Sequence, residues 1–354
     1  MRIGIYDPYL DDLGGGEKYM MSVAAALSKS HEVSVFWDNQ KDIDLLLQRF
    51  SLDISKVQRV KNIFAPNISL LERLPASRQY DSIIVLSDGS IPILLSQKLF
   101  LHVQQPLHMA KKGFWSAFKM SRVDKIFCNS NFTKNFVDPS FVNKTVVIFP
   151  PVTLYPKKVK KENIILHVGR FRVKNIAIGD YKKQSIMIDE FKNMVDKGLK
   201  DWKFVLAVSI MEKDKEIFDK LVESTKGYPI EFAINKSNKE LWDLYSLAKI
   251  YWHASGYGED LRIHPEYAEH FGISTVEAMG AGAVPVVINA GGQKEIVTNL
   301  ENGLLWDSLK ELKEKTLQLI NKPALLDKLS IQAKHRAQDF SYEKFSEAVT
   351  NLIG

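Results

Sequence analysis

Short apolar runs alternate with longer amphipathic segments along most of the chain. The first half contains the apolar runs RIGIY, EVSVFW, SIIVL, LFLHV and KIFCN, with segments of helical spacing such as EKYMMSVAAALSK between them. Apolar runs of roughly four to eight residues predict buried strands, whereas apolar residues three and four apart predict helices. Because this alternation is typical of parallel sheets with right-handed crossovers, we predict an α/β fold.

The same alternation restarts in the second half. Residues 150–163 are rich in Pro and Lys and form the best candidate for a linker. The apolar runs IILHVGR, KFVLAVS, IEFAI, IYWHAS and VPVVI follow, again separated by amphipathic segments, and the tail reads as helical throughout. We therefore predict two doubly wound Rossmann-like domains over residues 1–153 and 154–337, with a terminal helix over 338–354. Such domains bind ligands beyond the carboxyl ends of their strands.

The composition is that of an ordinary globular protein, because 45% of the 354 residues are hydrophobic and 25% are charged. A single cysteine, Cys128, excludes an intrachain disulfide and indicates a reducing compartment. No apolar run reaches the roughly 18 residues of a membrane span, and the first residues lack the apolar core of a signal peptide. We therefore expect a cytoplasmic protein, and a net charge of +6 does not indicate a nucleic-acid partner.

The strongest candidate for chemistry is the stretch HPEYAEHFGISTVEAMGAG, residues 264–282. Gly272, Ile273 and Ser274 precede an apolar run and predict the start of a helix. Glu269 then lies before this helix and Glu277 within its first turns. Amides at a helix start can bind phosphate, and the two carboxylates can accept hydrogen bonds from sugar hydroxyls. The stretch therefore predicts a site for a diphosphate with a sugar on each side, as in a nucleotide sugar.

Two other segments follow predicted strands and carry candidate phosphate-binding groups. Arg170 ends a strand, and Lys182 and Lys183 open the next helix, so a guanidinium and an ammonium group flank a helix start. Ordinary surface charge is the alternative. Gly15 and Gly16 precede the first helix in the run GGGEKY, whose spacing does not fit a dinucleotide fingerprint. A flexible turn is the alternative there.

The stretch at 264–282, with NGLLW after it, resembles the E-x7-E donor motif of the family 4 retaining glycosyltransferases. The similarity extends to GGGEKY, LHVQQP, NSNFTKNF and HVGRF with the following KKQ and IDEF. Its spacing is most similar to the subgroup of lipid-linked oligosaccharide α-mannosyltransferases. The resemblance implies a GT-B fold, in which an N-terminal acceptor-side domain (1–153) and a nucleotide-sugar-binding domain (154–337) face a cleft. The final helix (338–354) would cross back to the first domain.

The resemblance also implies roles for individual residues. Glu277 corresponds to the glutamate that binds the ribose hydroxyls, and Glu269 to the one that contacts the donor-sugar hydroxyls. The other matched positions are Phe271, Gly272 and Ile273 for the segment that holds sugar and phosphates, Arg170 and Lys182 (with Lys183 as the alternative) for the basic pair on the diphosphate, Gly15 and Gly16 for the glycine loop, and His102 for the histidine near the reactive carbon. The residues alone favour a satisfied histidine at a strand end for His102, and only the resemblance favours the site.

These assignments predict a retaining hexosyltransferase that needs no metal or other cofactor. The donor would be GDP-mannose or a UDP-hexose, and the acceptor a glycan, in particular a lipid-linked one. A soluble sugar or sugar-phosphate acceptor, a nucleotide-sugar 2-epimerase and a non-catalytic nucleotide-sugar binder are the alternatives. Asp42 and Asp44 have the D-x-D spacing of a metal site, but charges at a helix start explain them better.

Residues 106–125 mix basic and aromatic side chains. Lys111, Lys112 and Lys119 are interleaved with Trp115 and Phe118, as in helices that lie on an anionic membrane surface. We therefore expect peripheral contact with the cytoplasmic face of a membrane, on the acceptor side. The alternative is that the aromatic side chains pack on the sheet and the lysines are solvated.

Overall fold

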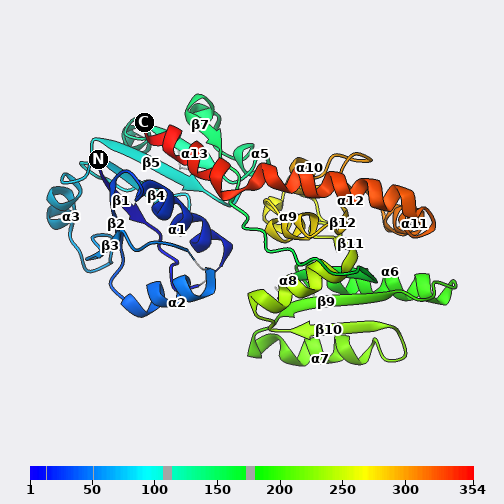
Figure 1. Cartoon of the computed structure of the whole chain (residues 1–354). Coiled ribbons are helices and arrows are strands. Elements are labelled where there is room, and N and C mark those ends of the chain that lie inside the picture. The colour runs from blue at the N-terminus through cyan, green and yellow to red at the C-terminus, as the bar shows by residue number, and fades with distance from the viewer. Residues whose placement is uncertain (13, 51, 107–113, 173–179) are drawn as a thin grey trace. The chain divides into compact units, whose positions relative to one another are not determined.

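The computed structural model describes residues 1–12, 14–50, 52–106, 114–172 and 180–354, and the chain forms two compact units. Unit 1 comprises Met1–Pro151 and Tyr342–Gly354, and unit 2 comprises Val152–Ser341. Each unit is a sheet flanked by helices (Figure 1). The predicted domain change after residue 153 lies two residues beyond the observed one, and the predicted change after residue 337 lies four residues before it.

The sheet of unit 1 is parallel in every described pair of strands. Its described strands are β1 (Arg2–Tyr6), β2 (Glu32–Phe36), β3 (Val57–Val60), β4 (Ser82–Leu86), β5 (Lys98–Val103), β6 (Lys125–Cys128) and β7 (Thr145–Val147). They lie in the order β3-β2-β1-β4-β5-β6-β7, so the direction of winding reverses between β1 and β4. This switch point is where doubly wound sheets leave a crevice for ligands.

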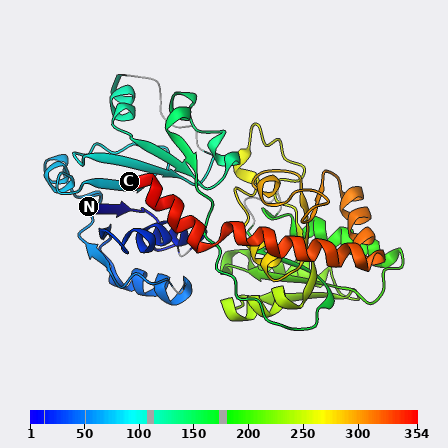
Figure 2. The same cartoon turned by 45° about the horizontal axis from the view of Figure 1, so that its top comes forward.

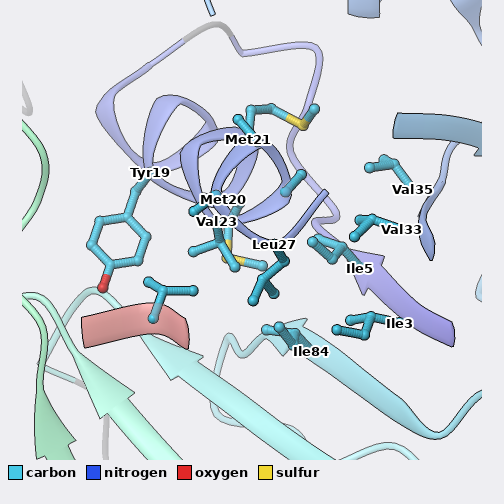
Figure 3. Close-up of a cluster of buried hydrophobic side chains, with 14 of the residues drawn as sticks. Ile3, Ile5, Tyr19, Met20, Met21, Val23, Leu27, Val33, Val35 and Ile84 are labelled. Carbon is cyan, nitrogen blue, oxygen red and sulfur yellow. The ribbon is translucent and has the colours of Figure 1, made fainter. Parts of the chain in front are cut away.

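Helices cover both faces of this sheet. They are α1 (Gly15–Leu27), α2 (Gln40–Phe50), α3 (Leu70–Ser77), α4 (Phe114–Ser121), α5 (Asn131–Lys134), the 3-10 helix η1 (Pro139–Lys144) and α13 (Tyr342–Ile353). Ile3 and Ile5 alternate along β1 toward one face, where side chains of α1 pack on them and on Ile84 of β4 (Figure 3). Each such buried aliphatic side chain contributes roughly 1.5–3 kcal/mol relative to exposure.

The C-terminal helix belongs to unit 1. Phe345, Val349 and Ile353 recur four residues apart on α13 and are buried in the same apolar cluster as α1 and β1. Both chain ends therefore lie in this unit (Figure 2). The predicted return of the last helix to the first domain is confirmed.

Unit 2 repeats the architecture with its own core. Its described strands are β8 (Glu162–Arg170), β9 (Lys203–Ser209), β10 (Ile230–Ile234), β11 (Ala248–His253), β12 (Val284–Ile288) and β13 (Leu304–Trp306). They are parallel and lie in the order β10-β9-β8-β11-β12-β13, which places the switch point between β8 and β11. The predicted pair of doubly wound α/β sheets is therefore confirmed.

The helices of unit 2 cover both faces of this second sheet. They are α6 (Gln184–Asp196), α7 (Lys215–Glu223), α8 (Asn238–Leu247), α9 (Ile273–Gly280), α10 (Gln293–Ile296), α11 (Leu309–Asn321) and α12 (Pro323–Ala337), with the 3-10 helices η2 (Glu212–Asp214), η3 (Pro265–Tyr267) and η4 (Gln338–Phe340). The predicted ligand segments follow β8 and β11, the two strands at the switch point. The fold thus brings the ends of both strands to one edge of the sheet.

Candidate functional site

Helix α9 begins at the glycine that the sequence indicated. Gly272 is its N-cap, with φ of +121°, a conformation that residues with a Cβ rarely adopt. A Cβ at this position would also lie 2.6 Å from Nε2 of Gln293. Glycine is therefore required for the turn that starts α9, and the amides of Ile273 and Ser274 lie too early in the helix to bond to a carbonyl one turn before them. They form the positive end of the helix dipole.

Glu269 lies just before this turn and is held by two donors from other segments. Its Oε2 accepts a hydrogen bond from Nζ of Lys182 at 2.6 Å and lies 2.8 Å from Nε2 of His253, at the end of β11. Burial alone would raise the pKa of Glu269, but Lys182 and His253 overcome this effect and hold it well below its usual range. Glu269 is therefore a carboxylate at neutral pH and an acceptor of hydrogen bonds.

Glu277 lies inside α9, on the other side of the helix start. Its Oε2 accepts a hydrogen bond from the hydroxyl of Tyr245 in α8 at 2.8 Å. Ser274 is held in the same way, because its Oγ lies 2.8 Å from the hydroxyl of Tyr251 in β11. Two tyrosines thus orient the polar side chains of the first turns of α9.

The predicted basic residues occupy three different environments. Lys182 and Glu269 have side chains that are 18% and 20% exposed, so their ion pair is accessible from solvent. Lys183 adopts a left-handed backbone conformation, is 8% exposed and is paired with Glu259. Arg170 is exposed at the end of β8, and its guanidinium group forms no hydrogen bond or ion pair with the residues that the structure describes. Lys182 and Arg170 therefore remain the more accessible cations.

The remaining residues of the motif support the backbone. Phe271 is 3% exposed and packs edge-on against Phe340, with ring centroids 5.3 Å apart. Ile273 is the first residue of α9 and is partly buried. The amide of Gly292, at the start of α10, donates to the carbonyl of Glu269 at 2.7 Å. The segment from Glu269 to Ile273 is thus fixed by packing and by backbone hydrogen bonds.

In unit 1, His102 lies inside the core. It is fully buried, its ring stacks on Tyr19 at 4.1 Å between centroids, and its Nδ1 lies 3.0 Å from the carbonyl of Phe127. Burial lowers the pKa of His102 to about 3, so the ring is neutral at physiological pH. Tyr19 and Phe127 both stack on this ring.

The glycine run of unit 1 lies beside Gln104. Gly15 and Gly16 open α1, and a Cβ on Gly16 would lie 2.2 Å from Oε1 of Gln104. Gln104 is partly buried just beyond β5, and its carbonyl accepts from Nδ2 of Asn129 at 3.0 Å. A side chain at position 16 would therefore require the amide group of Gln104 to move.

Comparison with known proteins now adds the family. The family profile described as "Glycosyl transferases group 1" matches residues 155–336, which is more than half of the chain and contains the whole arrangement around Glu269. The chain belongs to the group 1 glycosyl transferases.

Individual members of related groups are distant. GDP-Man:Man(3)GlcNAc(2)-PP-Dol alpha-1,2-mannosyltransferase of Dictyostelium discoideum is 26% identical over 246 residues, which cover 64% of this chain and 46% of that protein. The chain therefore matches about half the length of that relative. Alpha-1,3/1,6-mannosyltransferase ALG2 of the same organism is 22% identical, over 96% of this chain and 76% of its own length.

Solved structures of similar fold cover almost the whole chain. Anabaena Alr3699/HepE in complex with UDP has a TM-score of 0.73 and 16% identity, over 99% of both chains. The complex of the same protein with UDP-glucose has a TM-score of 0.71 and 18% identity, over 99% of this chain and 98% of that one. The predicted family and its GT-B fold are therefore confirmed.

In this group 1 glycosyl transferase, three polar residues that touch or border predicted site residues were not selected from the sequence. They are His253, Tyr245 and Gln104. His253 had a usable signal, because it ends an apolar run and a strand end at a switch point faces the ligand crevice. Tyr245 had none, since it lies on the buried face of an ordinary amphipathic helix.

The remaining predictions for the group 1 glycosyl transferase concern metal and membrane. Within the described ranges, no three His, Cys, Asp or Glu side chains are grouped as metal ligands would be. Asp42 accepts from Nε1 of Trp37 at 2.8 Å in the first turn of α2. None of the helices described is long and apolar enough to cross a bilayer. Lys111, Lys112 and the side chain of Trp115 lie outside the described residues, whereas Phe118 is 47% exposed.

Proposed function

We propose that this chain transfers a hexose from a nucleotide diphosphate sugar to a glycan hydroxyl with retention of anomeric configuration. The observation that carries the proposal is the Glu269 carboxylate, held by Lys182 and His253 directly before the start of α9. A carboxylate, a cation and free helix amides in one place match the hydroxyls and the diphosphate of such a donor.

The diphosphate would bind at the first turn of α9. Its charge matches the helix dipole there, and Arg170 and Lys182 supply two cations. Lys182 is paired with Glu269, so a diphosphate that binds this ammonium group must compete with the carboxylate. Donor binding therefore includes a rearrangement of this ion pair, in which Glu269 exchanges Lys182 for hydroxyls of the sugar.

Glu269 and Glu277 would bind the two ends of the donor, the transferred sugar and the ribose. Glu269 is ionised, so it orients sugar hydroxyls and does not act as a general acid at neutral pH. Glu277, oriented by Tyr245, would accept hydrogen bonds from the ribose hydroxyls. The polar groups on α9 and before it thus bracket the diphosphate.

The reaction we propose is a front-face displacement. As the bond from the sugar to the diphosphate breaks, negative charge grows on the leaving oxygen, and Arg170, Lys182 and the helix amides stabilise it. The acceptor hydroxyl attacks from the same face and passes its proton to the departing phosphate. Because the protein supplies the positive charge, turnover should continue in the presence of a chelator. A requirement for a divalent ion would overturn this part.

For the donor we favour GDP-mannose over UDP-glucose. Several of the relatives matched by sequence are named as users of GDP-Man or as mannosyltransferases, whereas UDP-glucose is bound by a protein that is similar only in fold. The name of the first of these relatives favours an acceptor linked to a lipid diphosphate, whereas a relative that is 33% identical over 92 residues is named D-inositol 3-phosphate glycosyltransferase.

A donor panel tests the proposal. GDP-mannose at 100 times its dissociation constant should stabilise the protein by about 2.7 kcal/mol in thermal unfolding, and UDP-glucose should stabilise it less. Glu277→Gln should reduce the stabilisation by about half or more at the same ligand concentration, whereas Glu216→Gln, a change on the exposed face of α7, should leave it unchanged. Transfer of labelled mannose to a lipid-linked glycan, rather than to a soluble sugar phosphate, is the second readout. Binding without transfer to any acceptor would favour a non-catalytic binder.

We also propose that α4 and the residues before it contact an anionic membrane surface. The exposed Phe118 of α4 and the predicted row of lysines support the proposal. Vesicles containing anionic lipid should sediment the protein at low salt but not at high salt. The Lys111/Lys112/Lys119→Glu variant should stay in solution, whereas Lys310/Lys322/Lys328→Glu, at exposed lysines of unit 2, should sediment normally. Absence of sedimentation at low salt would contradict the proposal.

A further inference from the structure

A pocket of about 410 Å³ lies wholly within unit 1. Its floor includes Tyr6 at the end of β1 and Leu86 at the end of β4, so it opens at the switch point of this sheet. Arg73 of α3, the segment after β4 and Lys119 of α4 form its sides. Both the place and the volume are those of a small-molecule site in a doubly wound domain.

Two stacked aromatic rings and a guanidinium group line part of the pocket. Tyr6 and Phe64 stack with ring centroids 4.0 Å apart and planes at 10°. The guanidinium carbon of Arg73 lies 5.5 Å from the centroid of the Phe64 ring, and its Nε donates to the carbonyl of Ile63 at 2.9 Å. The ring and this hydrogen bond fix the guanidinium group without neutralising its charge.

The pocket contains more positive than negative charge. Neither Arg73 nor Lys119 forms an ion pair with any residue that the structure describes. The acidic side chain of the lining is Asp88, whose Oδ1 accepts from the amide of Ser90 in its own loop at 3.1 Å. An anion of the ligand would therefore find two cations that have no described carboxylate partner. A planar guanidinium favours the oxygens of a phosphate.

Apolar side chains also line the pocket. Val85, Leu86 and Ile91 are buried where they line it, and Pro92 and Ile93 extend the wall toward the surface. An aliphatic chain that covers this wall would remove apolar surface from water, which is favourable. The wall and the cations belong to the same 410 Å³ space, so one ligand must satisfy both.

We propose that this pocket binds the acceptor through a phosphate group and the first part of an attached hydrocarbon chain, of the isoprenoid or alkyl type. The proposal rests on the function proposed above and specifies the substrate of its acceptor side. Arg73 and Lys119 hold the phosphate, and the side formed by Leu86 and Ile91 packs on the hydrocarbon.

Geranyl phosphate is a probe of the right size and charge. We expect it to bind the whole chain in calorimetry or in ligand-detected NMR, more than tenfold tighter than inorganic phosphate or uncharged geraniol. Arg73→Gln and Lys119→Gln should each weaken it by about tenfold. Arg78→Gln, at an exposed arginine just after α3, should leave it unchanged. Lys119→Gln keeps the inference testable if loss of the Arg73 hydrogen bond destabilises unit 1.

Equal binding of geraniol, or of inorganic phosphate alone, would overturn the inference, as would full binding to Lys119→Gln. Its failure is separable from failure of the proposed function. GDP-mannose binding that Glu277→Gln weakens, together with no geranyl phosphate binding, would overturn the pocket alone. Binding of geranyl phosphate that depends on Arg73, without any nucleotide-sugar binding, would support the pocket and overturn the transferase.

Discussion

Asp7 follows β1 and is fully buried, with no hydrogen-bond partner for its Oδ2 among the described residues. Its Oδ1 accepts from the amide of Tyr9 at 2.9 Å. Burial raises the pKa of Asp7 to about 7, against an ordinary value near 3.8. The folded protein therefore holds a proton here that the unfolded chain releases in mild acid.

This proton makes unit 1 sensitive to pH. Because the folded pKa is raised, its contribution to stability is complete below about pH 4 and is lost as the pH rises toward 7. The loss is on the order of 4 kcal/mol, at about 1.36 kcal/mol for each pKa unit. Asp7→Asn cannot ionise, so denaturant unfolding of the variant should change less between pH 5 and pH 8 than that of the wild type. An equal change in both proteins would show that Asp7 is ionised in the fold.

Substitutions of the two site glutamates should have different effects on the binding of GDP and of GDP-mannose. Glu277→Gln should weaken GDP and GDP-mannose alike, by roughly 1.5–3 kcal/mol, because both ligands carry the ribose. Glu269→Gln should weaken GDP-mannose only. It should bind GDP as well as the wild type or better, since Lys182 no longer has an ionised partner to leave. Calorimetric titration of both ligands measures the difference, and weaker binding of GDP to Glu269→Gln would contradict the ion-pair exchange.

At the residue scale, the sequence predicted chemical types better than contacts. Lys182 and Glu269 were assigned to one site although 87 positions separate them, and the structure brings them together. His102 and Gln104 show the limit, because both belong to LHVQQP but only Gln104 reaches the glycine run. Which of two nearby polar residues meets a neighbouring loop depends on helix packing, which a local pattern does not contain.

At the scale of elements, the turn that starts α9 depends on the backbone conformation and the free space at one glycine. Gly272→Ala introduces strain at φ of +121° and a collision with Gln293, whereas Gly198→Ala, at φ of +100°, meets nothing within 4 Å. Both variants should lose about 1 kcal/mol or more through backbone strain. Gly272→Ala should lose more stability and should also bind GDP less tightly. Equal unfolding free energies for the two variants would show that Gln293 yields without cost.

Most strands were predictable, and the two that were not predicted are the edge strands of the unit 1 sheet. The runs SIIVL and VPVVI are buried along their whole length as β4 and β12, so their apolar pattern is continuous. The edge strands β3 and β7 were not predicted, because VQRV and TVV are short and partly exposed. An edge strand packs on one neighbour, so its sequence carries less apolar signal.

At the scale of the whole molecule, unit 1 is made of two separate stretches of chain. Phe345→Ala in α13 should remove about 3–5 kcal/mol from unit 1, because it leaves a cavity against α1. Hydrogen exchange should then accelerate in α1 and β1 and stay unchanged in the strands of unit 2. Glu347→Ala, at an exposed position of the same helix, is the control. Faster exchange in both units would mean that they unfold together.

The discontinuity of unit 1 also sets an order of events during synthesis. Residues 152–341 form a continuous unit, and all of them must be made before the helix that completes the apolar cluster of residues 3–148. At about 5–20 residues per second, this takes roughly 10 to 40 seconds. For that interval the apolar face of α1 has no cover from Phe345, Val349 and Ile353. The apolar face of α1 is therefore exposed for longer than it would be in a unit made from one continuous stretch of chain.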